Sequence, residues 1–274
     1  MKKILILVLA VMVLSLVFAG CGQAPAADTQ QSADVSPAAI DDASAPSDDT
    51  AAVSEAPASG AGTPAESYVA FTQAKSAVVT KLSDGLSNNQ DTVFASMTLL
   101  GITMADLMML PVSFFGAGEE AASVGLAMLN ASDVKYSENG NSYAITYTDE
   151  QGDTYVFSGT YDAAADALTC TAQKNGENSF SSEYRKTSYG YVSQYFFIND
   201  DGTTNLYQFA ISGEDGAFGV STTQTAQPAA LTGSEAADFA TALPEWYSIQ
   251  GSTITGVMSD GTEINFEYVP SATE

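Results

Sequence analysis

The sequence predicts an α+β domain in which N-terminal helices pack on a large, curved antiparallel β-sheet. Between residue 67 and about residue 130 of the 274-residue chain, apolar residues recur at helical spacing. From residue 131 onward they alternate with polar residues, as they do in strands with one buried face. Pairs of Asn or Asp followed by Gly divide this second part, and such pairs favour tight hairpin turns. We therefore expect about nine to eleven strands that follow one another as a meander.

Residues 1–20 have the organisation of a signal peptide. Two lysines precede an apolar run over residues 4–18 whose only hydroxyl residue is Ser15, and small residues follow before Cys21. A helix of this length spans about 22 Å, which is less than the ~30 Å hydrocarbon core of a bilayer. Cleavage after export is therefore expected, in preference to a permanent membrane span.

The cleavage region, Val17-Phe18-Ala19-Gly20-Cys21, resembles the lipobox of bacterial lipoproteins. In that family an invariant cysteine receives a diacylglycerol thioether before cleavage, and Phe18 departs from the leucine usual at its position. The resemblance implies a lipid anchor on Cys21, which would hold the protein at the extracytoplasmic face of the cell membrane. The alternative is an ordinary secretory peptide in which a cysteine follows the cleavage site by chance.

Residues 21–66 predict a disordered linker behind the lipidated cysteine. The segment is rich in Ala, Ser, Thr and Pro, carries eight acidic residues and has no Lys or Arg. Such a composition buries too little apolar surface to form a core. The remaining residues, 67–274, are the expected length of a single globular domain, with helices over 67–130 and the sheet over 131–274.

Three helices are expected in the N-terminal third of this domain. The first begins at Thr63, because Thr63 and Glu66 have capping-box spacing around a proline, and Gly85 marks its expected end. The second covers about residues 91–110 and stops at Pro111. The third covers about residues 118–129 and ends at Asn130.

Five Asx-Gly pairs predict hairpin turns between strands of the sheet. A short helix is expected over residues 234–243, between two of the strands. The pairs are Asn139-Gly140, Asn175-Gly176, Asp201-Gly202, Asp215-Gly216 and Asp260-Gly261. Two middle strands, residues 189–198 and 206–211, are apolar on both faces. Both of their faces must be covered, so we expect helices on one side and, on the other, curling of the sheet, a second layer or a cavity for an apolar ligand.

Methionine and aromatic residues supply the candidate lining of such a cavity. Methionines at helical spacing give an adaptable apolar surface, although they are equally typical of a plain core. The candidate residues are Met97, Met104, Met108, Tyr191, Tyr195, Phe197 and Phe209.

No catalytic, cofactor-binding or metal-binding residue can be assigned from the sequence. The chain has no histidine, which removes the usual general base and imidazole metal ligand, and it has no nucleotide-binding glycine loop. We therefore expect a protein that is not an enzyme and has no cofactor. The domain has 25 acidic and six basic residues, which disfavours nucleic acid as a partner. Cys170, in an alternating strand pattern, is expected to be a buried thiol.

The predicted layout resembles lipoprotein carriers of the LolA type, in which helices lie against an unclosed barrel that holds acyl chains. This resemblance concerns architecture alone, so no functional residue is transferred. It implies a non-enzymatic binding module for an apolar or amphipathic ligand, such as a lipid. The alternative is a cell-envelope lipoprotein with a structural or protein-interaction role.

Overall fold

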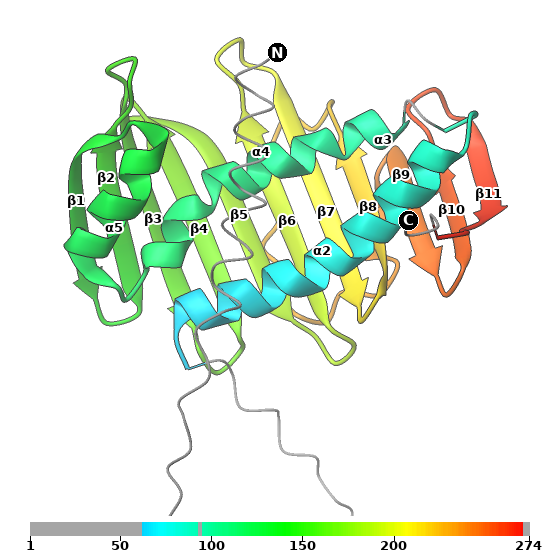
Figure 1. The fold of residues 1–274 in the computed structure, drawn as a ribbon, viewed down its shortest axis with the longest axis horizontal. Coiled ribbons are helices and arrows are strands. Elements are labelled where there is room, and N and C mark those ends of the chain that lie inside the picture. The colour runs from blue at the N-terminus through cyan, green and yellow to red at the C-terminus, as the bar shows by residue number, and fades with distance from the viewer. Residues whose placement is uncertain (1–61, 93–94, 271–274) are drawn as a thin grey trace, which may run out of the picture. The chain divides into compact units, whose positions relative to one another are not determined.

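The computed structural model describes residues 62–92 and 95–270 of the chain. The predicted signal peptide, Cys21 and nearly all of the predicted linker lie outside these residues. Within the described part the predicted fold class is confirmed: N-terminal helices lie on an open, curved antiparallel sheet (Figure 1). No helix among the described residues is long and apolar enough to cross a bilayer.

All eleven strands form one antiparallel meander in which each strand pairs with its neighbours in the sequence. The strands are β1 (Ser132–Asn139), β2 (Ser142–Thr148), β3 (Thr154–Asp162), β4 (Ala167–Lys174), β5 (Glu177–Lys186), β6 (Tyr191–Ile198), β7 (Thr204–Ser212), β8 (Asp215–Ser221), β9 (Glu245–Gln250), β10 (Thr253–Val257) and β11 (Glu263–Glu267).

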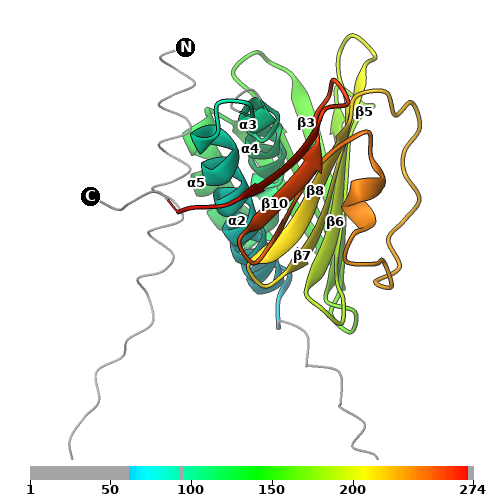
Figure 2. The ribbon, with the colours of Figure 1, turned by 90° about the vertical axis from the view of Figure 1, so that its right-hand side faces the viewer.

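The helical elements cover one face of this sheet, here called the inner face (Figures 1 and 2). They are α2 (Pro64–Asn88), α3 (Ala95–Thr98), α4 (Leu100–Met108), the 3-10 helix η2 (Leu110–Phe114), α5 (Gly118–Leu126) and η3 (Ala127–Leu129). Helix α2 runs across the strands and contacts β4, β7, β8 and β9, while α5 packs on β1. The main hydrophobic core lies between the helices and the inner face.

Helix α2 begins where its capping box predicts. Thr63 is the N-cap, and the Thr63 hydroxyl and the Glu66 carboxylate each accept a backbone N–H bond from the other residue. The helix therefore starts at Pro64, three residues before the predicted domain boundary. Its predicted end at Gly85 is wrong, because the helix continues to Asn88 and buries Gly85. A Cβ at Gly85 would lie 2.3 Å from Ile254 Cδ1, so this glycine allows α2 to approach β10 closely.

The second predicted helix, residues 91–110, is divided into shorter elements. Residues 95–98 form α3 and residues 100–108 form α4, and Pro111 lies inside η2 where a helix end was expected. Proline is tolerated there because it occupies the first turn of η2. The third helix agrees with the sequence: α5 and η3 end at Asn130, which adopts the left-handed conformation with φ 57°.

Four of the five predicted Asx-Gly turns join neighbouring strands, and the fifth prediction is wrong. Asp215 and Gly216 lie inside β8, and the β7–β8 turn uses Gly213, with φ 63°. Gly216 is instead required by packing, since a Cβ there would lie 2.5 Å from the Ala210 carbonyl oxygen. The predicted helix over residues 234–243 is shorter than expected and forms only the 3-10 helix η4 (Phe239–Ala242).

A second layer covers the opposite face, here called the outer face, over β5–β9. This layer is the long β8–β9 connection, residues 222–244, which lies across these strands (Figure 2). Leu231 of the connection packs against Val192 and Ala210, and Phe239 adjoins this small cluster. The expectation that both faces of the middle strands are covered is therefore confirmed, and a second layer provides the cover.

Enlarging Gly85 should destabilise the domain, although replacing a helical glycine usually stabilises a helix. We expect Gly85→Leu to lower the free energy of unfolding by about 1–3 kcal/mol, because the new side chain overpacks against Ile254. Urea unfolding followed by circular dichroism measures this difference. Ser87→Leu, at an exposed position of the same helix, is the matched control, and equal effects of the two changes would contradict close packing at Gly85.

Candidate functional site

Three of the predicted lining residues, Tyr191, Tyr195 and Phe209, lie together in the core between α2 and the inner face. Tyr195 and Phe209 meet edge to face with ring centroids 6.1 Å apart, and Tyr191 meets Phe71 of α2 at 5.7 Å. Tyr195 is 1% exposed and Phe209 0% exposed. Protein atoms therefore enclose both side chains, as in a packed core.

The other predicted lining residues do not lie around a common cavity with these three. Met104 of α4 is 57% exposed to solvent. Met108 and Phe197 are partly buried and pack against the main core. The side chain of Met97 lies outside the described parts of the structure. The aromatic members of the predicted set therefore form packed core, as methionine and aromatic stripes often do.

A buried lysine occupies the centre of this core, and the sequence analysis did not find it. Lys75 of α2 is 2% exposed; its ammonium contacts the carboxylate of Asp106 on α4 and donates to the Tyr195 hydroxyl at 3.2 Å. The ammonium also lies 5.1–5.8 Å from the ring centroids of Phe71, Tyr195 and Phe209. The charge is thus paired and surrounded by aromatic faces, which is the condition for burying it.

Lys75 remains protonated in this environment. Burial by itself lowers the pKa of an ammonium, but Tyr195 and the Asp106 carboxylate outweigh it, and the pKa of Lys75 is raised. Burial raises the pKa of Tyr195 to about 12. A raised lysine pKa contributes stability that is complete below the unfolded-state value, near 10.4, and is lost only as pH rises through the folded-state value. At neutral pH the arrangement therefore stabilises the fold and offers no free base.

Removing the carboxylate should cost more stability than removing the amine. We expect Asp106→Asn to lower the free energy of unfolding by about 2–3 kcal/mol, because it leaves the Lys75 charge buried and unpaired. Lys75→Met should cost less, since the methionine side chain stays apolar and Asp106, which is 34% exposed, can be hydrated. Urea unfolding of both variants near pH 7 measures the difference; a larger loss for Lys75→Met would contradict this view of the pair.

A second buried polar cluster ties the beginning of α2 to the β3–β4 turn. Ser67 of α2 donates to Asp166 Oδ1 at 2.5 Å, and Tyr161 donates to the same oxygen at 3.3 Å. Lys186 pairs with the other carboxylate oxygen at 3.8 Å. Asp166 adopts a left-handed backbone with φ 45°, which is uncommon outside glycine. Asp166 and Ser67 are buried and the groups of this cluster are partnered, so it serves attachment of the helix.

Cys170 is buried in β4, as predicted. Burial raises the pKa of its thiol well above the ordinary value, so the reactive thiolate is scarce at physiological pH. Among the described residues, no group of three or more His, Cys, Asp or Glu side chains is arranged to hold a metal ion.

Native protein should therefore not react with a thiol reagent through Cys170. We expect negligible labelling by an aromatic disulfide reagent at about pH 8 in buffer and full labelling of this thiol in urea, because unfolding removes both the burial and the raised pKa. Absorbance of the released thiolate measures the reaction. Fast labelling of Cys170 in the native state would contradict its burial.

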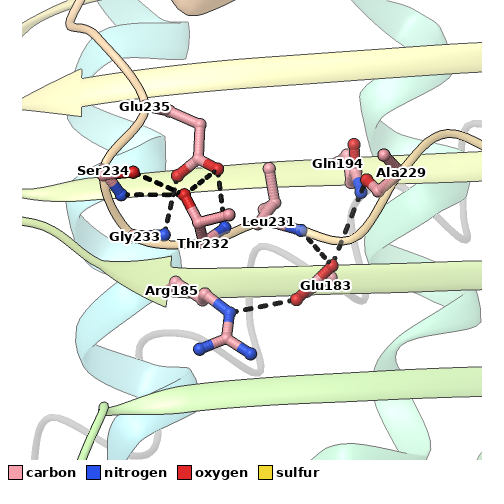
Figure 3. A network of polar contacts seen from close by, with 9 residues as sticks. All are labelled: Glu183, Arg185, Gln194, Ala229, Leu231, Thr232, Gly233, Ser234 and Glu235. Carbon is pink, nitrogen blue, oxygen red and sulfur yellow. Dashed lines mark hydrogen bonds and ion pairs between the residues drawn. The ribbon is translucent and has the colours of Figure 1, made fainter.

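On the outer face, Glu183 of β5 fastens the 222–244 connection to the sheet (Figure 3). One carboxylate oxygen accepts the backbone N–H of Leu231 at 2.9 Å, and the other accepts from Arg185 Nε at 3.1 Å. Gln194 of β6 donates to the Ala229 carbonyl oxygen at 2.8 Å. These two side chains thus hydrogen-bond the backbone of a chain segment that crosses the strands.

Over β1–β4 no other element of the described residues covers the outer face, which carries hydroxyl groups in register. One row pairs Ser142, Thr160 and Thr169 across β2, β3 and β4, and a parallel row pairs Ala144, Ser158 and Thr171. These residues form the floor of an open hollow of about 390 Å³. Glu183 and Gln194 continue the first row on β5 and β6, so the hollow and the fastened connection share one line of side chains.

In comparisons with known proteins, the chain matches no protein family, no curated protein and no solved structure. The candidate site consequently rests on geometry. The uncovered rows of β1–β4 are the one cluster described above whose polar groups face solvent in a hollow, whereas the Lys75 and Asp166 clusters are buried and partnered.

Proposed function

We propose that this protein is a lipid-anchored, extracytoplasmic lipoprotein that acts without catalysis as an interaction module of the cell envelope. The uncovered outer face of β1–β4 is its contact surface. The observation that supports this proposal most directly is the unequal cover of the outer face. Residues 222–244 protect β5–β9, while the adjoining hydroxyl rows of β2–β4 remain open to a partner.

The packed core supports this proposal over that of an apolar-ligand carrier. Phe209 and Tyr195 have essentially no exposed surface, so a lipid could reach them only after α2 had moved away from the sheet. Such a movement would expose the Lys75 charge pair and break the Ser67–Asp166 contact. Both clusters oppose it, which makes a ligand held between helix and sheet the weaker proposal.

Anchoring depends on Cys21. Two acyl chains on one cysteine supply the double attachment that a stable membrane anchor needs, and the acidic domain adds no attraction to anionic lipid. The partner would therefore be met at a distance from the bilayer set by the segment that precedes α2. Nucleic acid is not the proposed partner, because the domain lacks a basic surface.

Loss of the anchor should release the protein without unfolding it. We expect Cys21→Ala to move from the membrane fraction to the medium or periplasm, since no other lipid attachment is proposed. Cell fractionation and immunoblotting measure this, and Cys170→Ala is the matched control that should stay in the membrane fraction. Unchanged fractionation of Cys21→Ala would contradict the proposed anchor.

Photo-crosslinking in whole cells tests the contact surface. A photoreactive amino acid at Thr171, exposed on the outer face, should give a reproducible adduct, because the partner is proposed to lie against this face. The same group at Ser76, exposed on α2, is the control and should give none. Adducts from Ser76 alone would contradict the proposed contact surface, and a lipid that co-purifies stoichiometrically with the protein would favour the carrier over the interaction module.

A further inference from the structure

We propose that the hollow over β1–β4 is a binding site for a neutral glycan chain, laid across the strands along the two hydroxyl rows. This inference rests on the proposed function and names the chemistry of the partner.

The hollow has the dimensions and regularity that a short carbohydrate needs. Its volume of about 390 Å³ lies within the ~300–1,000 Å³ of small-molecule sites. Neighbouring strands are about 4.8 Å apart, so Ser142, Thr160 and Thr169 present one hydroxyl per strand at that interval. A polymer with closely repeated polar groups can therefore meet several of these hydroxyls at once.

Most of these hydroxyls have their hydrogen-bonding capacity available. Among the described residues, the Ser142 and Thr160 hydroxyls share one long contact of 3.5 Å, and Ser158, Thr169 and Thr171 make no side-chain hydrogen bond. Each hydroxyl can donate one hydrogen bond and accept two. The floor thus offers donors and acceptors together, which suits a ligand whose groups are themselves hydroxyls and amides.

The same row already holds an extended polar chain a short distance away. On β5 and β6, Glu183 and Gln194 bind the backbone N–H of Leu231 and the carbonyl of Ala229, as the 222–244 connection crosses the strands. Registers place these residues directly beyond Thr169 in the first row. The part of the first row on β5 and β6 thus binds the protein's own backbone, and the part on β2–β4 is free. A glycan that crosses β2–β4 would bind this free part.

Charge selects a neutral glycan over an acidic one. Glu138 is the one acidic residue that lines the hollow, and no Lys or Arg lines it. The surrounding domain has 25 acidic and six basic residues. Anionic polymers such as uronic-acid or phosphate-bearing chains would be disfavoured, since the residues that line the hollow include no cation to pair with them. The methyl groups of Ala144 and of the threonines can make apolar contacts with the methyl group of an acetamido substituent.

Binding of defined sugars to the full chain in detergent tests the site. The probe is the tetramer of N-acetylglucosamine, with polygalacturonate as the acidic comparison. We expect saturable binding of the tetramer with a Kd of about 1 mM or tighter and none of the polygalacturonate, measured by calorimetry. The double variant Thr160→Val and Thr169→Val keeps shape and strand propensity but removes two hydroxyls, and should weaken binding at least about tenfold.

Matched valine substitutions on β10, at Thr253 and Thr255, should leave binding unchanged. Absence of tetramer binding, or equal binding by the wild type and the Thr160/Thr169 variant with unaltered circular dichroism, would overturn the glycan site. If Thr171 then still crosslinks a protein in cells, the interaction function stands and the glycan inference falls alone. If neither measurement gives a partner, both fall.

Discussion

The constraint on which the architecture depends is the two-sided apolar character of β6 and β7. Tyr195 and Phe209 point to the inner face, while Val192 and Ala210 point to the outer face, and all four are buried. An antiparallel sheet normally leaves one face to water, so these strands need a layer on each side. The helices cover the inner face of these strands, and residues 222–244 cover the outer face. Both layers lie where the middle strands require them. The outer side chains of β2–β4 are mostly Ser and Thr, and no other described element covers them.

The fold class could be predicted because its signals are local. Helical spacing, strand alternation and the capping box at Thr63 act within a few residues, and the meander follows because neighbouring strands join through tight turns. The predictions for Gly85 and Gly216 are wrong because glycine, which can end a helix or form a turn, also allows a neighbouring element to approach closely. The role of Gly85 depends on the packing of α2 on Ile254, and that of Gly216 on the packing of β8 on β7. Neither contact can be read from the local sequence.

The buried polar groups could not be assigned, since their partners are distant in the sequence. Lys75 meets Asp106 and Tyr195, and Ser67 meets Asp166, contacts that need the helices already seated on the sheet. One signal was present: Lys75 interrupts the apolar stripe that Phe71 and Val78 define, and a charge on such a stripe indicates a buried partner. The hydroxyl rows depend on strand register, which hairpin turns fix only when each turn is placed correctly.

The orientation of α2 has a consequence for the width of the sheet. From Ser67, which contacts the β3–β4 turn, to Gly85, which contacts β10, the helix rises about 27 Å, and the six strand intervals from β4 to β10 measure about 29 Å. The length of α2 therefore limits how many strands can lie between its two end contacts. A hairpin inserted within β4–β10 would separate its two end contacts by about 10 Å more than the helix can reach. A hairpin added before β4 or after β10 would leave both end contacts of α2 in place. The fold therefore tolerates a change in strand number only at the two edges of the sheet.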